Sequence, residues 1–322
     1  MIGVGGRSRP LSVYVMLAAL GLVLGSRAWA EEPKSDRKVE HTFEYELTSY
    51  DVPGSTYTLV LGIDDKGLIV GRYGDASGDH GFIRGESATV ETLDAPGAVF
   101  TEAFDITNEG RVAGWMKDAA GVQHGFTYQA GVFQQIDVAG ADGTIVLGIN
   151  DRGDLAGPFF KGGTEHGFLL KHGVRHSGGL SQFDPAGSVF TEVYGLNDAG
   201  TSVGLFDDAA GEHGFVRDAG GRITVFSYPG VEFSGLLGLN DRGIYTGYFD
   251  DTEGSHGLVW DGGAGLTTLD FPGAPLTVPV GINDAGTIGG FYEDASGIRH
   301  GFEATRRGQD CDDHDHRDDQ RR

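Results

Sequence analysis

The stretch "GINDAGTIGGFYEDASGIRHGF", residues 281–302, decides the fold because close copies of it recur along the chain. It contains an Asn-Asp-x-Gly segment, a short apolar run, a second Asp-to-Gly segment and a final His-Gly-Phe. In isolation, these His and Asp residues would resemble a catalytic or metal-binding motif. Their recurrence indicates instead that they build a repeated structural unit.

The His-Gly-Phe element and two companion series each occur six times. The histidines, 42 to 47 residues apart, are His80, His124, His166, His213, His256 and His300. The second series runs "GIDDKG", "DITNEG", "GINDRG", "GLNDAG", "GLNDRG" and "GINDAG". The third runs "YDVPGS", "LDAPGA", "IDVAGA", "FDPAGS", "FSYPGV" and "LDFPGA". A period of this length, with several turns in each unit, is typical of β-propeller blades.

The turn chemistry of the unit predicts its strands. Asn-Asp-x-Gly suits a type I turn whose fourth residue is left-handed, which glycine tolerates. The Asp-to-Gly segments at 75–78 and 294–297 follow the same logic, and alternating segments between turns are typical of strands. The 56 glycines would interrupt long helices. The sequence therefore predicts an all-β fold, a six-bladed β-propeller with four antiparallel strands per repeat, over residues 43–305.

The iterated "D-x-P-G-A…G-I-N-D-x-G…G-x-x-H-G-F" pattern resembles the HAF-type extracellular repeat of exported bacterial proteins. The resemblance covers all six units and implies a secreted repeat protein, but it carries no activity to transfer. The second unit departs from the pattern at Glu109, the third lacks its Asp turn at "KGGTEH", and the fifth departs at Ser227 and Leu258. We expect these changes to loosen single turns without opening the ring.

The two ends of the chain differ from the repeats. Arg7 and Arg9 precede the apolar run 11–25, and Ala28 and Ala30 occupy the small-residue positions of a cleavage site. This is the pattern of a secretory signal peptide, so we expect cleavage near Ala30 and a secreted or periplasmic protein.

A short lead, residues 31–42, would then precede the repeats, and an acidic, His-containing tail follows at 306–322. The tail contains few apolar residues, so the sequence predicts that it is disordered. His314 and His316 could bind a divalent metal only loosely, because nothing in the sequence fixes them in a coordination geometry.

Charge and cysteine content exclude several classes. The net charge of −23 repels nucleic acid and anionic membranes. No second apolar segment follows the signal peptide, so we expect no membrane insertion. The single cysteine, Cys311, excludes an intrachain disulfide and a cysteine-rich zinc site.

The repeated polar residues are predicted to be structural, because a feature present six times around a ring is a poor candidate for one active site. We expect the six histidines to be hydrogen-bonded to backbone or Asp and not to ligate a metal. We expect Asp65, Asp151, Asp198, Asp241 and Asp284 to cap their own turns. The aromatic residues after the repeated glycine should pack between blades; they are Tyr73, Phe159, Phe206, Phe249 and Tyr292. Ser202 in "GTSVG" fits the nucleophile-elbow pattern but falls inside a predicted strand, so no catalytic residue is predicted.

The least regular part of the chain is the candidate ligand site. The spacing between His166 and His213 is the longest, and the excess lies in residues 171–184. This segment brings together four basic side chains on an acidic protein, namely Lys171, His172, Arg175 and His176. An irregular insertion on a regular scaffold is a common place for binding residues, although a longer turn is the simpler alternative.

Three classes of function remain after these exclusions. The first is an exported binding or scaffolding module for a glycan or protein of the cell envelope, which we expect to be a monomer. The second is a propeller hydrolase or lyase acting on sugars or lactones. The third is a repeat protein whose acidic turns bind calcium for stability, although one turn at a time supplies too few oxygen ligands. Because the fold supports all three, the sequence favours binding only by the lack of a non-repeated catalytic cluster.

Overall fold

The computed structural model describes residues 44–85, 89–172, 179–263 and 265–307, all within one compact unit, 39–322. These residues form 25 strands and no helix, as predicted. No helix in this part of the chain could therefore cross a membrane. The predicted signal peptide at 1–30, the lead at 31–42 and the tail beyond Arg307 lie outside the described residues.

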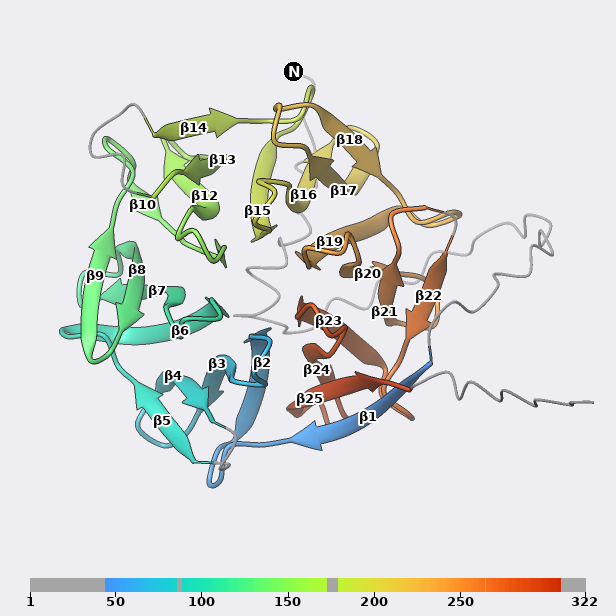
Figure 1. Cartoon of the computed structure of the whole chain (residues 1–322), viewed down its shortest axis with the longest axis horizontal. Helices are drawn as coiled ribbons and strands as arrows, with labels where there is room; N and C mark the ends of the chain where they lie inside the picture. Colours follow the sequence, from blue (N-terminus) through green and yellow to red (C-terminus); the bar gives the residue numbers. More distant parts are fainter. Residues whose placement is uncertain (1–43, 86–88, 173–178, 264, 308–322) are drawn as a thin grey trace, which may run out of the picture. The chain divides into compact units, whose positions relative to one another are not determined.

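Antiparallel sheets are arranged around a common centre (Figure 1). The first sheet consists of β2 (Tyr57–Ile63), β3 (Ile69–Gly74), β4 (Asp79–Arg84) and β5 (Val90–Leu93). The second consists of β6 (Ala98–Ile106), β7 (Val112–Asp118), β8 (Gln123–Gln129) and β9 (Val132–Ile136). The third consists of β10 (Gly143–Thr144), β11 (Gly148–Ile149), β12 (Leu155–Lys161), β13 (Thr164–Leu170) and β14 (Leu180–Phe183). In each sheet the chain runs outward from an inner strand beside the centre to an outer edge strand.

The remaining strands form one sheet of twelve, in which three groups can be distinguished. The first group is β15 (Phe190–Leu196), β16 (Ser202–Asp208), β17 (Gly211–Arg217) and β18 (Ile223–Phe226). The second is β19 (Phe233–Leu239), β20 (Tyr245–Asp250), β21 (Ser255–Trp260) and β22 (Leu266–Leu269). The third is β23 (Leu276–Ile282), β24 (Ile288–Glu293), β25 (Arg299–Arg306) and β1 (Tyr45–Tyr50). Single parallel pairs, Glu212 with Phe233 and Ser255 with Leu276, join the groups.

The first described strand completes the sheet of the last repeat. β1 pairs antiparallel with β25, so that Tyr45 lies opposite Arg306 and Tyr50 lies opposite Gly301. Residues from both ends of the described chain therefore share one sheet, and their backbone hydrogen bonds hold the last repeat against the start of the first.

The Asn-Asp-x-Gly turns have the predicted geometry. Their glycines have φ between 75° and 85°, the left-handed region, at Gly67, Gly110, Gly153, Gly200, Gly243 and Gly286. In each turn this glycine N–H donates to the carbonyl oxygen of the first turn residue, for example Gly153 to Asn150 over 2.8 Å. A side chain at these positions would be strained, which explains why glycine recurs there.

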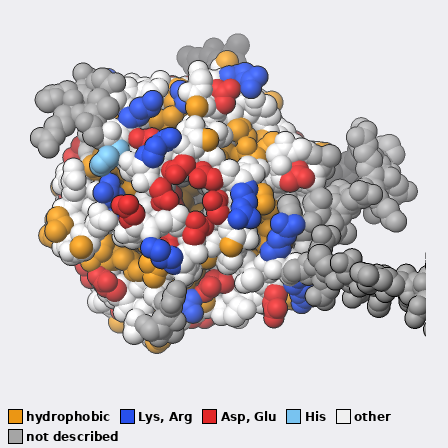
Figure 2. Space-filling view, in the orientation of Figure 1, with side chains coloured by type: hydrophobic (Ala, Val, Ile, Leu, Met, Phe, Trp, Pro, Cys, Tyr) orange, Lys and Arg blue, Asp and Glu red, His pale blue; other side chains and the backbone are white. Residues whose placement is uncertain are grey.

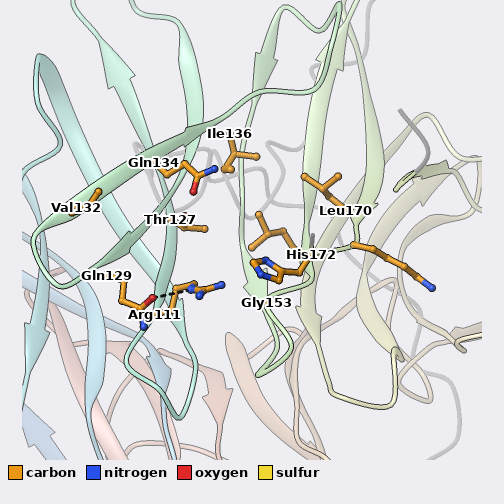
Figure 3. A pocket seen from close by; sticks show the side chains of 11 residues that line it. Arg111, Thr127, Gln129, Val132, Gln134, Ile136, Gly153, Leu170 and His172 are labelled. Atoms are coloured by element: carbon orange, nitrogen blue, oxygen red, sulfur yellow. Dashed lines mark hydrogen bonds between the residues drawn. The ribbon is translucent and has the colours of Figure 1, made fainter. Parts of the chain in front are cut away.

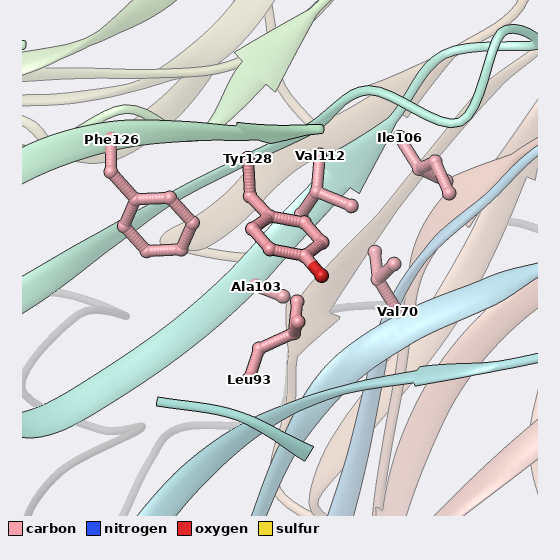
Figure 4. Close-up of a cluster of buried hydrophobic side chains, with 7 residues drawn as sticks. All are labelled: Val70, Leu93, Ala103, Ile106, Val112, Phe126 and Tyr128. Carbon is pink, nitrogen blue, oxygen red and sulfur yellow. The ribbon is translucent and has the colours of Figure 1, made fainter. Parts of the chain in front are cut away.

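The hydrophobic core is divided into clusters that lie between neighbouring sheets. Figure 4 shows one of them, in which Val70 and Leu93 of the first sheet meet Ala103, Phe126 and Tyr128 of the second. The last residue of each His-Gly-Phe element is fully buried, including Leu258, which replaces Phe in the fifth repeat. Each repeat therefore buries its apolar face only against its neighbours, as a repeat architecture requires.

Candidate functional site

The six repeated histidines are hydrogen-bonded to neighbouring side chains, in keeping with the structural role that the sequence predicts. In five repeats Nδ1 contacts the Asp of the "D-x-P-G" series at 2.8–2.9 Å, for example Asp94 from His80 and Asp51 from His300. In the fourth, His213 contacts the hydroxyl of Ser227 at 3.0 Å. No group of three or more potential metal ligands converges among the described residues. Each histidine thus links its strand to the loop that leads to the next repeat.

The aromatic residues after the repeated glycine lie beside these histidines. Tyr73 and His80 have ring centroids 5.3 Å apart, and Tyr292 stacks on His300 at 5.1 Å. The prediction of packing between blades is therefore incomplete, because each ring first covers the histidine of the adjacent strand. Tyr292 also stacks on Phe271 of the preceding loop at 3.7 Å, which is the contact between repeats that we expected.

The second residue of each Asn-Asp-x-Gly turn does not cap its own turn, which corrects the sequence prediction. The cap belongs to the first residue: Asn283 Oδ1 accepts from Thr287 N–H at 2.9 Å. The second residue accepts from the equivalent backbone N–H of the preceding repeat. These bonds, of 2.7–3.0 Å, connect Asp65, Asn108, Asp151, Asp198, Asp241 and Asp284 in a complete circle. The other predicted cap is correct, since Asp294 accepts from Ser296 N–H at 2.8 Å.

This circle of hydrogen bonds, here called the acidic ring, surrounds a hollow at the centre of one face (Figure 2). The hollow is a cavity of about 100 Å³. A smaller cavity of about 40 Å³ adjoins it and is lined by apolar side chains of the inner strands together with Asp105. Phe104 and Tyr194 both line this smaller cavity, and their ring centroids are 5.8 Å apart.

A group of buried carboxyl side chains lies deeper in the molecule, and sequence reasoning missed it. Glu102 is 1% exposed, contacts Arg72 at 3.2 Å and accepts from Trp115 Nε1–H at 2.7 Å. Glu192 is also fully buried and accepts from the Tyr194 hydroxyl at 2.7 Å. The signal was present in the sequence. Glu102 and Glu192 directly follow Thr101 and Thr191, and at the equivalent position the other four repeats have an apolar residue or Gly, namely Leu59, Ile145, Gly235 and Val278.

Burial keeps some of these carboxyl groups protonated. It raises the pKa of Glu165 to about 10, helped by the neighbouring carboxyl of Glu192. It also raises the pKa of Glu212 to about 8, against a hydrogen bond from Tyr248. Two adjacent carboxyl groups do not both ionise readily in such surroundings, so the neighbouring Glu192 adds to the effect of burial on Glu165.

A groove of about 640 Å³ lies between the second and third sheets (Figure 3). Thr127 and Gln129 of β8 line one wall together with β9, and Leu155 and Leu170 line the other. Two of the predicted site residues, Lys171 and His172, lie at its edge. The other two, Arg175 and His176, lie outside the described residues.

Arg111, which sequence reasoning did not select, joins this groove from the neighbouring repeat. Its guanidinium points toward the ring of His172, and both lie over Gly153 (Figure 3). A Cβ at Gly153 would be 2.7 Å from Arg111 Nη1 and 3.0 Å from His172 Cγ. Arg111 Nε also donates to Gln129 Oε1 at 3.2 Å, which fixes its direction. The lack of a side chain at Gly153 thus leaves room for Arg111 and His172, which come from different repeats, to lie close together.

A second groove of about 590 Å³ lies on the other side of Lys171 and His172, between the third and fourth repeats. Arg152 and Arg217 line it, together with Asp154. Lys171 and His172 therefore form a ridge between two grooves that both carry basic side chains, on a chain whose net charge is −23.

Comparisons with known proteins bear on the fold alone. No family model matches the sequence, and no curated protein matches it. Among solved structures, a protein of Agrobacterium tumefaciens assigned as TolB has a TM-score of 0.55 at 9% identity, over 78% of this chain and 91% of its own.

TolB from Acinetobacter baumannii has a TM-score of 0.52 at 12% identity, over 71% of this chain and 60% of its own. The β-propeller domain of the Trilobed protease from Pyrococcus furiosus, described as having an open velcro topology, has a TM-score of 0.49 at 10% identity. The match covers 78% of this chain and 97% of that domain. The chain has a β-propeller fold, and identities this low carry no statement about activity.

Proposed function

We propose that the protein is an exported binding module that holds a ligand of the cell envelope, a glycan or a protein segment, in the groove between its second and third sheets. The observation that carries this function is the convergence of Arg111 and His172 over Gly153, with Lys171 beside them. A cavity of about 640 Å³ has the size of a ligand site. Basic groups gathered in a groove of an otherwise acidic protein indicate recognition and not general solubility.

The scaffold of this module is a closed ring of six blades. Support comes from the pairing of β1 with β25 and from the acidic ring, whose last hydrogen bond runs from Asp284 to Asp65. A closed ring leaves no unpaired edge at its ends and holds the groove walls at a fixed separation. The protein belongs, on this proposal, to the HAF-type extracellular repeat proteins and acts as a monomer.

Export can be tested directly. The full chain expressed in a bacterium should be recovered from the periplasm or medium with a new N-terminus near Glu31, measured by mass spectrometry. Recovery from the cytoplasm with Met1 retained would contradict the proposed location.

The groove is tested by filling it. Leu170 occupies the repeat position at which the fifth repeat has Trp260, whose ring packs on Phe226 at 5.0 Å. Leu170→Trp should therefore fold, occupy the groove and abolish binding to arrays of defined oligosaccharides and peptides. Binding that persists in a folded Leu170→Trp variant would place the ligand elsewhere.

A second candidate is a hydrolase or lyase acting on sugars or lactones, and the Glu165 and Glu192 pair favours it. A carboxyl group that remains protonated at neutral pH is suited to general acid catalysis. Neither residue lines the grooves described above. Hydrolysis of a lactone panel by the wild type, lost in Glu192→Gln at unchanged melting temperature, would favour catalysis over binding.

A further inference from the structure

We propose that the groove between β9 and β13 binds an acidic peptide segment, whose carboxylate is held by Arg111 and His172 and whose aliphatic side chains lie along the groove walls. This inference rests on the proposed binding function and specifies its ligand. Three features of the described residues carry it: the uncompensated charge, the chemistry of the walls and the reason why the groove is open at this repeat.

The side chains at the basic end of the groove make no ion pair among the described residues, although the Asp154 carboxylate accepts from the His172 backbone N–H at 2.9 Å. Among the described residues, no carboxylate lies within 4.0 Å of a side-chain nitrogen of Arg111, Lys171 or His172. By contrast, Arg72, Arg84 and Arg299 each contact a Glu carboxylate. A guanidinium group that has no carboxylate partner is suited to a ligand carboxylate, which Arg can bind through two hydrogen bonds.

The walls of the groove favour a peptide over a sugar. Its apolar lining is aliphatic, with Val132 and Ile136 on one side and Leu155 and Leu170 on the other, and no aromatic residue of the described chain lines it. A pyranose ring usually lies against an aromatic face, which this groove lacks. Gln134 instead offers an amide group beside the aliphatic walls, which suits a peptide backbone with neighbouring aliphatic side chains.

A small aliphatic side chain helps to keep the groove open at the third repeat. The residue four positions after the repeated histidine is Tyr128 in the second repeat and Trp260 in the fifth, and both pack against other aromatic rings, whereas the first, fourth and sixth repeats have Arg84, Arg217 and Ala304 there. In the third repeat this residue is Leu170. This smaller side chain leaves space between the second and third sheets. Lys171 and His172 follow it directly in the sequence, so the groove and the basic side chains lie at the same repeat.

The experiment measures fluorescence polarisation of a labelled hexapeptide, Leu-Glu-Val-Glu-Leu-Ser, and of the same peptide with Gln in place of Glu. We expect the Glu peptide to bind the full protein and the Gln peptide to bind at least about tenfold more weakly, since two charge-assisted hydrogen bonds are lost. Arg111→Ala should weaken the Glu peptide about tenfold and leave the Gln peptide nearly unchanged. Raising the salt concentration should reduce only the affinity for the Glu peptide.

Arg222→Ala is the matched control, because Arg222 is 82% exposed and lies outside the groove, and its removal changes the net charge equally. It should leave both affinities unchanged. Equal weakening by Arg111→Ala and Arg222→Ala would show attraction by overall charge and overturn the inference. If an oligogalacturonate binds and Arg111→Ala abolishes that binding while the Glu peptide does not bind, the binding function stands and the peptide is wrong. If the Glu and Gln peptides bind equally, recognition of a carboxylate is wrong.

Discussion

The backbone N–H of Asp284 donates a hydrogen bond of 2.8 Å to Oδ1 of Asp65, although the two residues are 219 positions apart. Beside it, Asn283 Nδ2 donates to the carbonyl oxygen of Asp64 at 3.0 Å. The same two bonds connect several other pairs of neighbouring repeats, for example Asp241 to Asp284 and Asn240 to Asn283. The first and last repeats are thus joined by the bonds that join repeats adjacent in sequence, in addition to the pairing of β1 with β25.

The closing bond can be compared with an internal one. Asp65→Ala removes the acceptor of the closing bond, and Asp198→Ala removes the acceptor for Asp151 N–H. We expect each to lower the free energy of unfolding by about 1–2 kcal/mol, because each leaves a backbone donor without its partner. Urea denaturation measures both. A stable Asp65→Ala variant beside a destabilised Asp198→Ala variant would show that the ring is open between its ends.

Asp64→Asn should stabilise the protein by about 1 kcal/mol. Asn occupies this turn position in four other repeats, where its Nδ2 contacts Asp154 or the carbonyl oxygen of the next repeat. Asp64 is 2% exposed, and its Oδ2 has no hydrogen-bond partner among the described residues. An amide at this position could donate to the Thr107 carbonyl of the next repeat.

The gain from Asp64→Asn should depend on pH. Burial raises the pKa of Asp64, against the backbone N–H groups of Leu68 and Lys66 that lower it. A folded-state pKa above the unfolded value costs stability as the pH rises past the unfolded value, so the gain should be larger at neutral pH than at about pH 4. Thermal unfolding at both pH values checks this, and an equal gain would show that the missing donor alone matters.

The sequence predicted what depends on local geometry. The turn glycines, the strands between them and the structural role of the histidines follow from short segments, because turn type and strand alternation are properties of a few neighbouring residues. The acidic ring could not be predicted, since the acceptor for Asp65 N–H is Asn108, 43 residues away. Arg111 was missed for the same reason: it approaches His172 only after the second and third repeats pack together.

The role of Gly153 in the groove can be tested by comparing it with Gly243, a turn glycine that lies outside the groove. Gly153 and Gly243 have φ of 78° and 76°, but a Cβ at Gly243 would meet nothing within 4 Å. Gly243→Ala should therefore cost about 1 kcal/mol through left-handed strain alone. Gly153→Ala should cost at least as much and also displace Arg111 and His172, so it should weaken binding of the Glu peptide. Calorimetry and fluorescence polarisation check the pair, and equal peptide affinity in both variants would contradict the role given to Gly153.

The last prediction concerns His300, whose Nδ1 contacts Asp51 at 2.8 Å and whose Nε2 contacts Asp294 at 3.5 Å. Burial opposes the charged ring, but the hydrogen bonds and charges of these carboxylates raise the pKa of His300 above 6.5. A raised folded-state pKa contributes stability that is fully present below the unfolded value and is lost as the pH rises through the folded value. His300→Gln should therefore destabilise the protein more at about pH 6 than at about pH 9, as measured by urea denaturation. Asp51→Asn is the control, because it keeps a side-chain partner for His300 Nδ1 and removes the carboxylate, so in this background the effect of His300→Gln should change less with pH. A His300→Gln effect that is the same at both pH values would mean that the ring acts through packing on Tyr292 and not through its charge.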